Sequence, residues 1–215
     1  MMEQQLVEEF NVLKFDPSLY LERALTDINF QDWLIGNLTI DKHINLYYRS
    51  YYVLDLATIN EPQLFYHYWD SLVPLLKHKN TYHRCIAHRL LTNLVKIDQE
   101  KKLDKILADY LLILEDEKIQ NIIMGIRDLN IIFEIRADLI NNLVKYLLQI
   151  NYEHFNERQI IKLRFEILLL INQYLNTINL NQINDFLQTC KTYNKPNINK
   201  ILKQINIKLQ TRSEI

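Results

Sequence analysis

Four consecutive segments between Asn80 and Ile150 each carry apolar residues at the spacing of an amphipathic helix, and only short polar turns separate them. The apolar positions of the four segments are Tyr82, Ile86, Leu90, Leu94; Leu103, Ile106, Leu107, Tyr110, Leu111, Leu114; Ile119, Ile122, Ile126, Leu129, Phe133; and Leu139, Ile140, Leu143, Val144, Leu147. An isolated helix cannot shield such a stripe from water, so the segments are expected to pack on one another. The pattern predicts an all-α core.

The rest of the chain has the same character. The 215 residues include only 2 Gly and 4 Pro, whereas sheets and loop-rich folds need these residues in their turns. Further helices are predicted from apolar spacing and from start signals such as Asp16-Pro17, with Asn29 as one proposed cap and Lys195-Pro196-Asn197 as a turn. These helices are expected at 2–15, 19–25, 29–38, 44–59, 64–76, 158–175, 180–190 and 198–209.

Helix pairs recur along the chain at intervals of about 35–45 residues, which is typical of helical repeat proteins. NLYYRSYYVLDL, which contains Arg49, aligns with NTYHRCIAHRLL, which contains Arg84, 35 positions later. Arg164 lies in the first part of a similar long helix, in KLRFEILLLI. The sequence therefore predicts a repeated two-helix unit.

The segment HKNTYHRCIAHRLLTNLVKID resembles the second helix of a HEAT repeat, and EKKLDKILADYLLILEDEK resembles the first helix and turn of the next unit. The span from His78 to Ile150 is also similar to a group of small, uncharacterised bacterial HEAT-like proteins. The resemblance implies a right-handed α–α superhelix, a HEAT/ARM-like solenoid of about five helix pairs. We expect one continuous domain over residues 1–215.

Charge is balanced overall but unevenly distributed. The formal net charge is −1, which gives no global attraction to nucleic acid. Residues 1–60 hold nine acids and four bases, whereas residues 191–215 hold six bases and one acid. Two solvated ends explain this pattern, and end-to-end association of two chains or a partner on the basic tail are the alternatives.

No motif for catalysis or cofactor binding is present. The sequence lacks the phosphate-binding and nucleophile motifs GxxxxGK, GxGxxG and GxSxG. His83 and His88 are five residues apart, which does not suit a metal-binding helix face, and the isolated Cys85 and Cys190 form neither a metal cage nor a disulfide framework. We expect no cofactor, no metal, no membrane span and a cytoplasmic location.

The best candidate binding residues are expected on the second helices of the pairs, where HEAT-like solenoids usually bind their ligands. They are Tyr48, Arg49, Tyr52, Arg84 and His88. Arg and Tyr are favoured at recognition sites, although ordinary packing between helices explains these positions equally well. The sequence thus predicts a non-catalytic protein-interaction or scaffold module whose partner is another protein.

The alternative is nucleic-acid binding, with an activity like that of the DNA alkylation-repair glycosylases, which are similar in size and in expected architecture. By that analogy Trp33 or Trp69 would hold a flipped base and Asp70 would supply the carboxylate. Trp69 lies on an apolar stripe, which favours a place in the core, and the chain is not basic.

Overall fold

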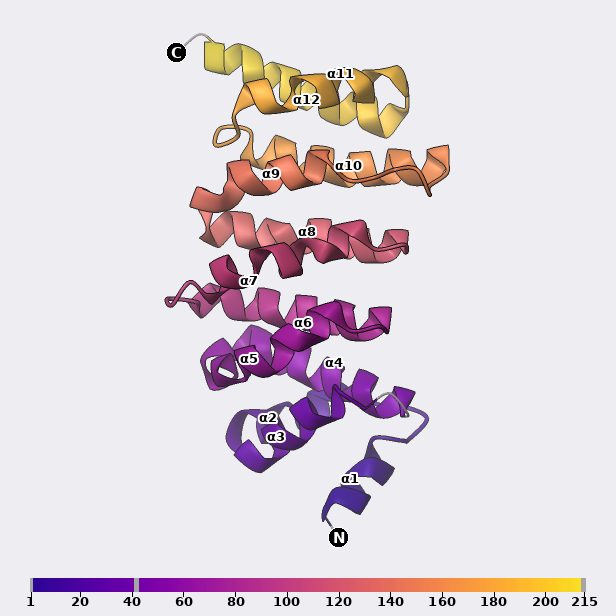
Figure 1. Cartoon of the computed structure of the whole chain (residues 1–215), viewed down its shortest axis with the longest axis vertical. Helices are drawn as coiled ribbons and strands as arrows, with labels where there is room; N and C mark the ends of the chain where they lie inside the picture. The colour runs from indigo at the N-terminus through magenta and orange to yellow at the C-terminus, as the bar shows by residue number, and fades with distance from the viewer. Residues whose placement is uncertain (1, 41–42, 214–215) are drawn as a thin grey trace. The chain divides into compact units, whose positions relative to one another are not determined.

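The computed structural model describes residues 2–40 and 43–213, and in these residues it contains helices and no strand (Figure 1). The predicted all-α class is therefore confirmed. Contacts group the chain into two compact units, residues 1–110 (unit 1) and residues 111–215 (unit 2). One continuous domain over residues 1–215 stays a prediction.

Unit 1 consists of α-helices of unequal length with short 3-10 helices between them. The α-helices are α1 (Met2–Glu9), α2 (Leu21–Thr26), α3 (Ile28–Asn37), α4 (Ile44–Asn60), α5 (Trp69–Leu72), α6 (Thr81–Leu94) and α7 (Lys102–Leu111), whose last residue begins unit 2. The 3-10 helices are η1 (Pro17–Tyr20), η2 (Pro62–Leu64), η3 (Tyr66–Tyr68), η4 (Val73–Lys77) and η5 (Val95–Ile97).

Unit 2 is built mainly from longer helices. They are α8 (Ile119–Ile135), α9 (Ile140–Leu148), α10 (Glu157–Tyr174), α11 (Leu180–Thr192) and α12 (Pro196–Ser213), with the 3-10 helices η6 (Leu112–Glu115) and η7 (Ala137–Leu139). α10 packs between α8 and α12, and α11 contacts both α9 and α12. The buried residues of these helices face one another, which gives unit 2 its own core.

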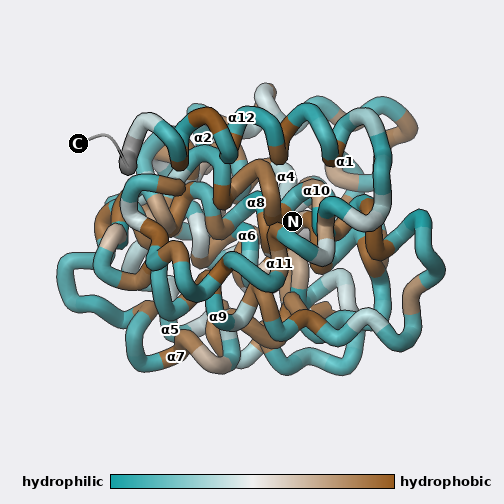
Figure 2. The backbone as a smooth tube through the Cα atoms, turned by 90° about the horizontal axis from the view of Figure 1, so that it is seen from above, coloured by the Kyte–Doolittle hydropathy of each residue, from teal (hydrophilic) through white to brown (hydrophobic). Residues whose placement is uncertain are grey.

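The amphipathic pattern places the core as the sequence predicts. Hydrophobic and hydrophilic residues alternate along the helices (Figure 2). Leu90 of α6 and Ile126 of α8 are fully buried. Four predicted stripe positions are only half-buried (Ile106, Leu107, Ile119 and Leu139), and Tyr82 is 46% exposed. It lies at the margin of the buried face of α6, one residue before the fully buried His83.

The N-terminal prediction is wrong in its details. The first helix ends at Glu9 and not at Phe15, because the chain turns to bring the Phe10 and Phe15 rings together, with their centroids 4.9 Å apart. In a continuous helix these two residues would point in different directions. Asp27, not Asn29, caps α3: its carboxylate accepts a hydrogen bond from the Phe30 amide.

Proline and capping signals are otherwise placed as expected. Asp16 accepts a hydrogen bond from the Ser18 amide at 2.9 Å, and Pro17 opens η1. Pro74 lies in η4, where the α-helix α5 has already given way to 3-10 geometry. Pro196 does not lie in a turn between helices but begins α12, where its missing amide hydrogen costs nothing.

Candidate functional site

α4 and α6 pack directly against each other and carry all five predicted binding residues. Tyr48, Arg49 and Tyr52 are on α4, and Arg84 and His88 are on α6. The structure divides them into two groups. The tyrosines lie at the surface of unit 1, whereas the arginines and the histidine take part in its packing.

Four tyrosines form a cluster that we call the tyrosine surface: Tyr48, Tyr51, Tyr52 and Tyr82. The Tyr48 ring lies edge-on to Tyr82 at 5.3 Å between centroids and is stacked with Tyr52 at 6.2 Å. Tyr51 and Tyr52 are 5.4 Å apart. Tyr52 is 47% and Tyr82 46% exposed, so the cluster presents ring faces and edges to solvent.

Local sequence explains how the rings meet. Tyr48 and Tyr52 are four residues apart on α4 and so share one side of that helix. The Asn80 side chain accepts a hydrogen bond from the Tyr82 amide at 3.0 Å, which caps α6 and fixes Tyr82 in its first turn. The sequence analysis missed Tyr82 because it assigned this residue to the core. The contact between the Tyr82 and Tyr48 rings makes Tyr82 part of the tyrosine surface.

The tyrosine surface is suited to binding and not to acid–base chemistry. Burial is the largest cause that raises the pKa of Tyr48 well above its usual range, and the neighbouring Tyr82, Tyr47 and Tyr52 raise it further. Its hydroxyl therefore stays neutral at physiological pH. Neutral phenols offer hydrogen-bond donors, acceptors and apolar ring area.

Arg49 and Arg84 hold chain segments in place. The Arg49 guanidinium donates from Nη1 to the Phe10 carbonyl and lies 5.2 Å from the centroid of the Phe15 ring. Arg84 Nη1 donates to the carbonyls of His78 at 2.9 Å and Lys79 at 3.2 Å. Each arginine thus donates hydrogen bonds to backbone carbonyls that precede its own helix.

His88 lies inside unit 1. Its side chain is 0% exposed and its ring is stacked on Tyr110, with centroids 4.0 Å apart. A partner at the surface cannot reach this ring unless the helices separate. We therefore assign His88 to the core and Arg49 and Arg84 to the support of the site; whether any of the five residues contacts a partner stays a prediction.

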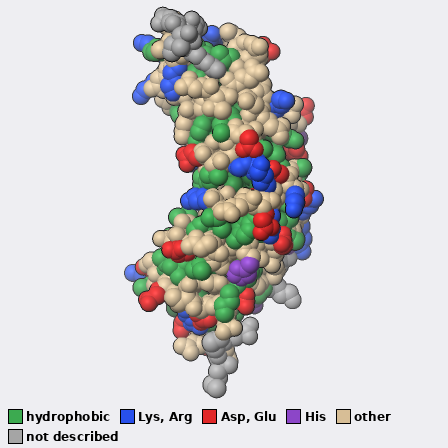
Figure 3. All heavy atoms as spheres, turned by 90° about the vertical axis from the view of Figure 1, so that its left-hand side faces the viewer, with side chains coloured by type: hydrophobic (Ala, Val, Ile, Leu, Met, Phe, Trp, Pro, Cys, Tyr) green, Lys and Arg blue, Asp and Glu red, His purple; other side chains and the backbone are tan. Residues whose placement is uncertain are grey.

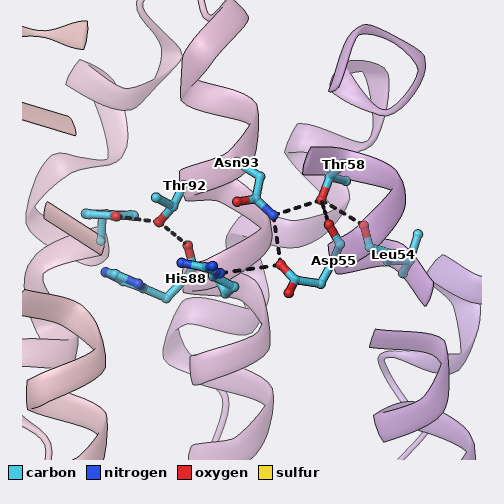
Figure 4. A network of polar contacts seen from close by, with 8 residues as sticks. Leu54, Asp55, Thr58, His88, Thr92 and Asn93 are labelled. Carbon is cyan, nitrogen blue, oxygen red and sulfur yellow. Dashed lines mark hydrogen bonds and ion pairs between the residues drawn. The ribbon is translucent and has the colours of Figure 1, made fainter. Parts of the chain in front are cut away.

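A buried polar network fixes α4 against α6 (Figure 4). Asn93 Nδ2 donates to Asp55 Oδ1 and to Thr58 Oγ1, both at 2.9 Å. Arg89 Nε donates to the same Asp55 oxygen at 3.4 Å, and Thr58 Oγ1 donates to the Leu54 carbonyl at 2.7 Å. These hydrogen bonds join α4 to α6 and favour the register in which Tyr48 and Tyr82 contact each other.

The residues considered for a glycosylase site do not have the arrangement that such a site requires. Trp69 is 1% exposed and belongs to the core. Trp33 is half-buried and stacks on Phe30 at 5.8 Å. The Asp70 carboxylate is 3.3 Å from Lys102 Nζ, and its side chain is 82% exposed. Trp69 has no ring face available to hold a flipped base, and Asp70 projects into solvent.

In the described part of the chain, no group of three or more His, Cys, Asp or Glu side chains could hold a metal ion. Cys85 and Cys190 are both free thiols. Burial is the main cause that raises the pKa of Cys190, which makes its thiol a poor nucleophile. No described helix combines the length and the hydropathy that crossing a membrane requires.

Comparisons with known proteins identify no relative. No family model matches this sequence, and no curated protein and no solved structure is significantly similar to it. The function is therefore inferred from the residues and contacts of the chain itself.

Proposed function

We propose that this protein is a non-catalytic protein-interaction module that binds a protein partner through the tyrosine surface of α4 and α6. In this proposal the helix pairs form a right-handed, HEAT-like solenoid of about five pairs in the cytoplasm. The sequence resemblance to HEAT repeats and the packing of α4 on α6 and of α10 on α8 and α12 support the architecture. The free thiols suit a reducing compartment.

The single observation that carries the proposal is the cluster in which the exposed rings of Tyr52 and Tyr82 contact the half-buried ring of Tyr48. Tyrosine is among the residues most enriched where proteins bind each other, because its ring gives a large contact area with few rotatable bonds. Here the rings are held in contact with one another by packing and by the network around Asn93. Little side-chain entropy is left to lose when a partner binds.

The charge of this region favours a protein over a nucleic acid. Three of the four tyrosines, Tyr48, Tyr51 and Tyr52, belong to residues 1–60, a stretch with nine acids and four bases, whereas Tyr82 lies outside it. A nucleic-acid backbone would be repelled by such a field, whereas a protein partner with a neutral or basic surface would not. Nucleic-acid binding at this surface therefore remains the less favoured alternative.

Site-specific photo-crosslinking in the native host tests the proposed surface. A benzophenone amino acid replaces Tyr52, and the control replaces Leu19, which is 77% exposed in the same unit but lies outside the cluster. We expect a discrete protein adduct from position 52 only, and a weaker one when Tyr82→Ala is added. Equal adducts from both positions, no adduct, or an adduct to nucleic acid would each contradict the proposal.

The architecture has its own test. A compact globule of this length has a radius of gyration of about 17 Å, and an extended superhelix exceeds it. Small-angle X-ray scattering of the monomer is expected to give a clearly larger value. A radius of gyration of about 17 Å would argue against the solenoid. It would not affect the tyrosine surface, which the crosslinking experiment tests separately.

A further inference from the structure

A row of cavities, which we call the groove, lies between α10 and α12 in unit 2. Residues 157–162 of α10 face residues 195–198, and residues 172–176 face residues 207–211, so the two helices run parallel. The groove opens into cavities of about 640 Å³ near the N-terminal ends, 290 Å³ in the middle and 520 Å³ near the C-terminal ends. Because the cavities follow one another along several turns of the two helices, they suit an elongated ligand such as a helix.

The floor of the groove is apolar. Ile161, Phe165 and Leu169 follow one another at intervals of four residues on α10, which places them about 6 Å apart along one side of the helix. Leu169 is 40% exposed. Phe165 lines the groove at both its N-terminal and middle cavities and also a further cavity of 440 Å³ between α8 and α10. Phe165 is thus the centre of the apolar floor.

The rim of the groove is basic. Arg158 and Lys162 of α10 stand on one side, and Lys195 and Lys200 stand on the other, at the start of α12. All four are exposed, and within the described residues none of them makes an ion pair with a carboxylate. Figure 3 shows Lys and Arg side chains beside hydrophobic ones at the end of unit 2 that carries the C-terminus.

Acidic groups do little to offset this charge. Glu157 is one of two acids that line the cavities. The other, Glu166, is held by Arg127, whose Nε and Nη2 donate to its two carboxylate oxygens at 3.0 and 2.6 Å. Four uncompensated bases therefore surround an apolar floor, which complements a partner that is both acidic and amphipathic.

We propose that this groove binds an acidic amphipathic helix of a protein partner, with Phe165 as the central contact and the four basic side chains as its rim. The inference rests on the proposed function as a protein-interaction module. A helix fits better than an extended segment because it satisfies its own backbone hydrogen bonds, and no strand edge exists in the described chain to pair with an extended one.

The floor also distinguishes a polypeptide from a nucleic acid. Ile161 and Leu169 would lie against a sugar–phosphate backbone that offers them no apolar surface, and Phe165 is the only ring in the groove on which a base could stack. Leucine side chains on a helix, repeated every three or four residues, match both the spacing and the chemistry of the floor.

A fluorescence-anisotropy titration of the full chain with a designed probe tests this site. The probe is a labelled, end-capped helical peptide of about 15 residues, with Leu at every fourth position and Glu on either side of that stripe. We expect a dissociation constant in the micromolar range that rises as salt is increased. Phe165→Ala and the double change K162E/K200E are each expected to weaken binding by about tenfold or more.

Two matched variants in the same unit serve as controls. Lys145→Glu on α9 reverses one exposed lysine outside the groove, which is half the charge change of K162E/K200E, and Leu112→Ala removes an apolar side chain that is 37% exposed. Both are expected to bind the probe as the unchanged protein does. Circular dichroism checks that each variant is folded. If Phe165→Ala disturbs the core, K162E/K200E still tests the site, because it alters only exposed side chains.

The inference would be overturned if the probe did not bind, or if K145E weakened binding as much as K162E/K200E does. It would also be overturned if a probe with Lys in place of Glu bound equally well, or if duplex DNA at micromolar concentration competed with the probe. Formation of a dimer through the same groove would overturn it as well. Crosslinking from position 52 tests unit 1 and not unit 2. If the peptide does not bind the groove but the adduct from position 52 still forms, only this inference is refuted. Peptide binding without a Tyr52 adduct refutes the tyrosine surface alone.

Discussion

Gly125 of α8 lies directly against Ile113 of η6. A Cβ atom at Gly125 would stand 2.6 Å from Ile113 Cγ2 and 3.4 Å from Leu114 Cδ2. Both neighbours are buried, so neither can move aside freely. The absence of a side chain at this position therefore lets α8 approach the preceding 3-10 helix closely, which is a packing requirement and not one of backbone conformation.

Replacing the two glycines of the chain by alanine should have opposite effects. Gly125→Ala is expected to lower the free energy of unfolding by about 1–3 kcal/mol because the new methyl group overpacks the contact with Ile113. Gly36→Ala on α3 meets nothing within 4 Å and is expected to add about 0.5–1 kcal/mol through helix propensity. Urea titration of both variants measures the difference; a stabilised Gly125→Ala would show that η6 can shift.

Leu90 and Ile126 anchor the cores of unit 1 and unit 2, respectively. Each is 0% exposed. Truncating either residue to Ala should cost about 2–5 kcal/mol, because a cavity remains in addition to the lost transfer free energy. The exposed Leu112 provides the comparison, since Leu112→Ala should change stability by less than about 0.5 kcal/mol. A cost below about 1 kcal/mol at Leu90 would mean that the core around α6 is loosely packed.

Asn93 joins α4 to α6 through hydrogen bonds to Asp55 and Thr58. Asn93→Ala removes the amide that donates to the buried Thr58 hydroxyl and leaves Asp55 with the longer hydrogen bond from Arg89. We expect it to lower the free energy of unfolding by about 1–3 kcal/mol. Asn60→Ala, which removes an exposed hydrogen bond to the Leu56 carbonyl, should have little effect. Chemical denaturation measures both changes in the free energy of unfolding. Similar values for the two variants would show that the network does not align α4 with α6.

Tyr152 is a buried phenol beside the Arg164 guanidinium, which lies 4.8 Å from its ring centroid. Burial is the main cause that raises its pKa to about 12 from 10.0, while Arg164 lowers it in part. Because the folded state holds the proton more tightly, this contribution to stability is complete below pH 10 and is lost as the pH rises from 10 to about 12. One such group changes the unfolding free energy by at most about 1.4 kcal/mol per pH unit.

The variant Tyr152→Phe should flatten that alkaline decline when unfolding is followed by circular dichroism at a series of pH values. Since the Tyr152 hydroxyl is buried without a hydrogen-bond partner, its removal should also raise stability at neutral pH slightly. A steeper decline in the variant than in the unchanged protein would be inconsistent with this assignment.

Alanine variants of Arg84 and Tyr52 should differ in stability, because Arg84 supports the fold whereas Tyr52 lies at the surface. Arg84→Ala frees the carbonyls of His78 and Lys79 and is expected to lower the free energy of unfolding by about 1–2 kcal/mol. Tyr52→Ala, at a 47% exposed ring, should change stability by less than about 0.5 kcal/mol. Thermal unfolding compares them, and an unstable Tyr52→Ala would identify Tyr52 as a packing residue.

Much of the architecture follows from local sequence. The positions of α6, α8 and α9 agree closely with the apolar spacing between Asn80 and Ile150, because an amphipathic stripe and a capping residue act within one helix. The early end of α1 could not be predicted in this way. It depends on Phe10 meeting Phe15 and Trp33, and such contacts between rings are not encoded in the spacing of one segment.

The candidate sites show the same division. Sequence alone determined that Tyr48 and Tyr52 share one side of a helix and that the C-terminal segment is basic, since both are properties of neighbouring residues. Only the tertiary structure decided that Tyr82 joins those tyrosines, that His88 is buried against Tyr110, and that α10 and α12 enclose a groove over Phe165. These features arise between helices, where packing decides which of several apolar or polar side chains are exposed to solvent.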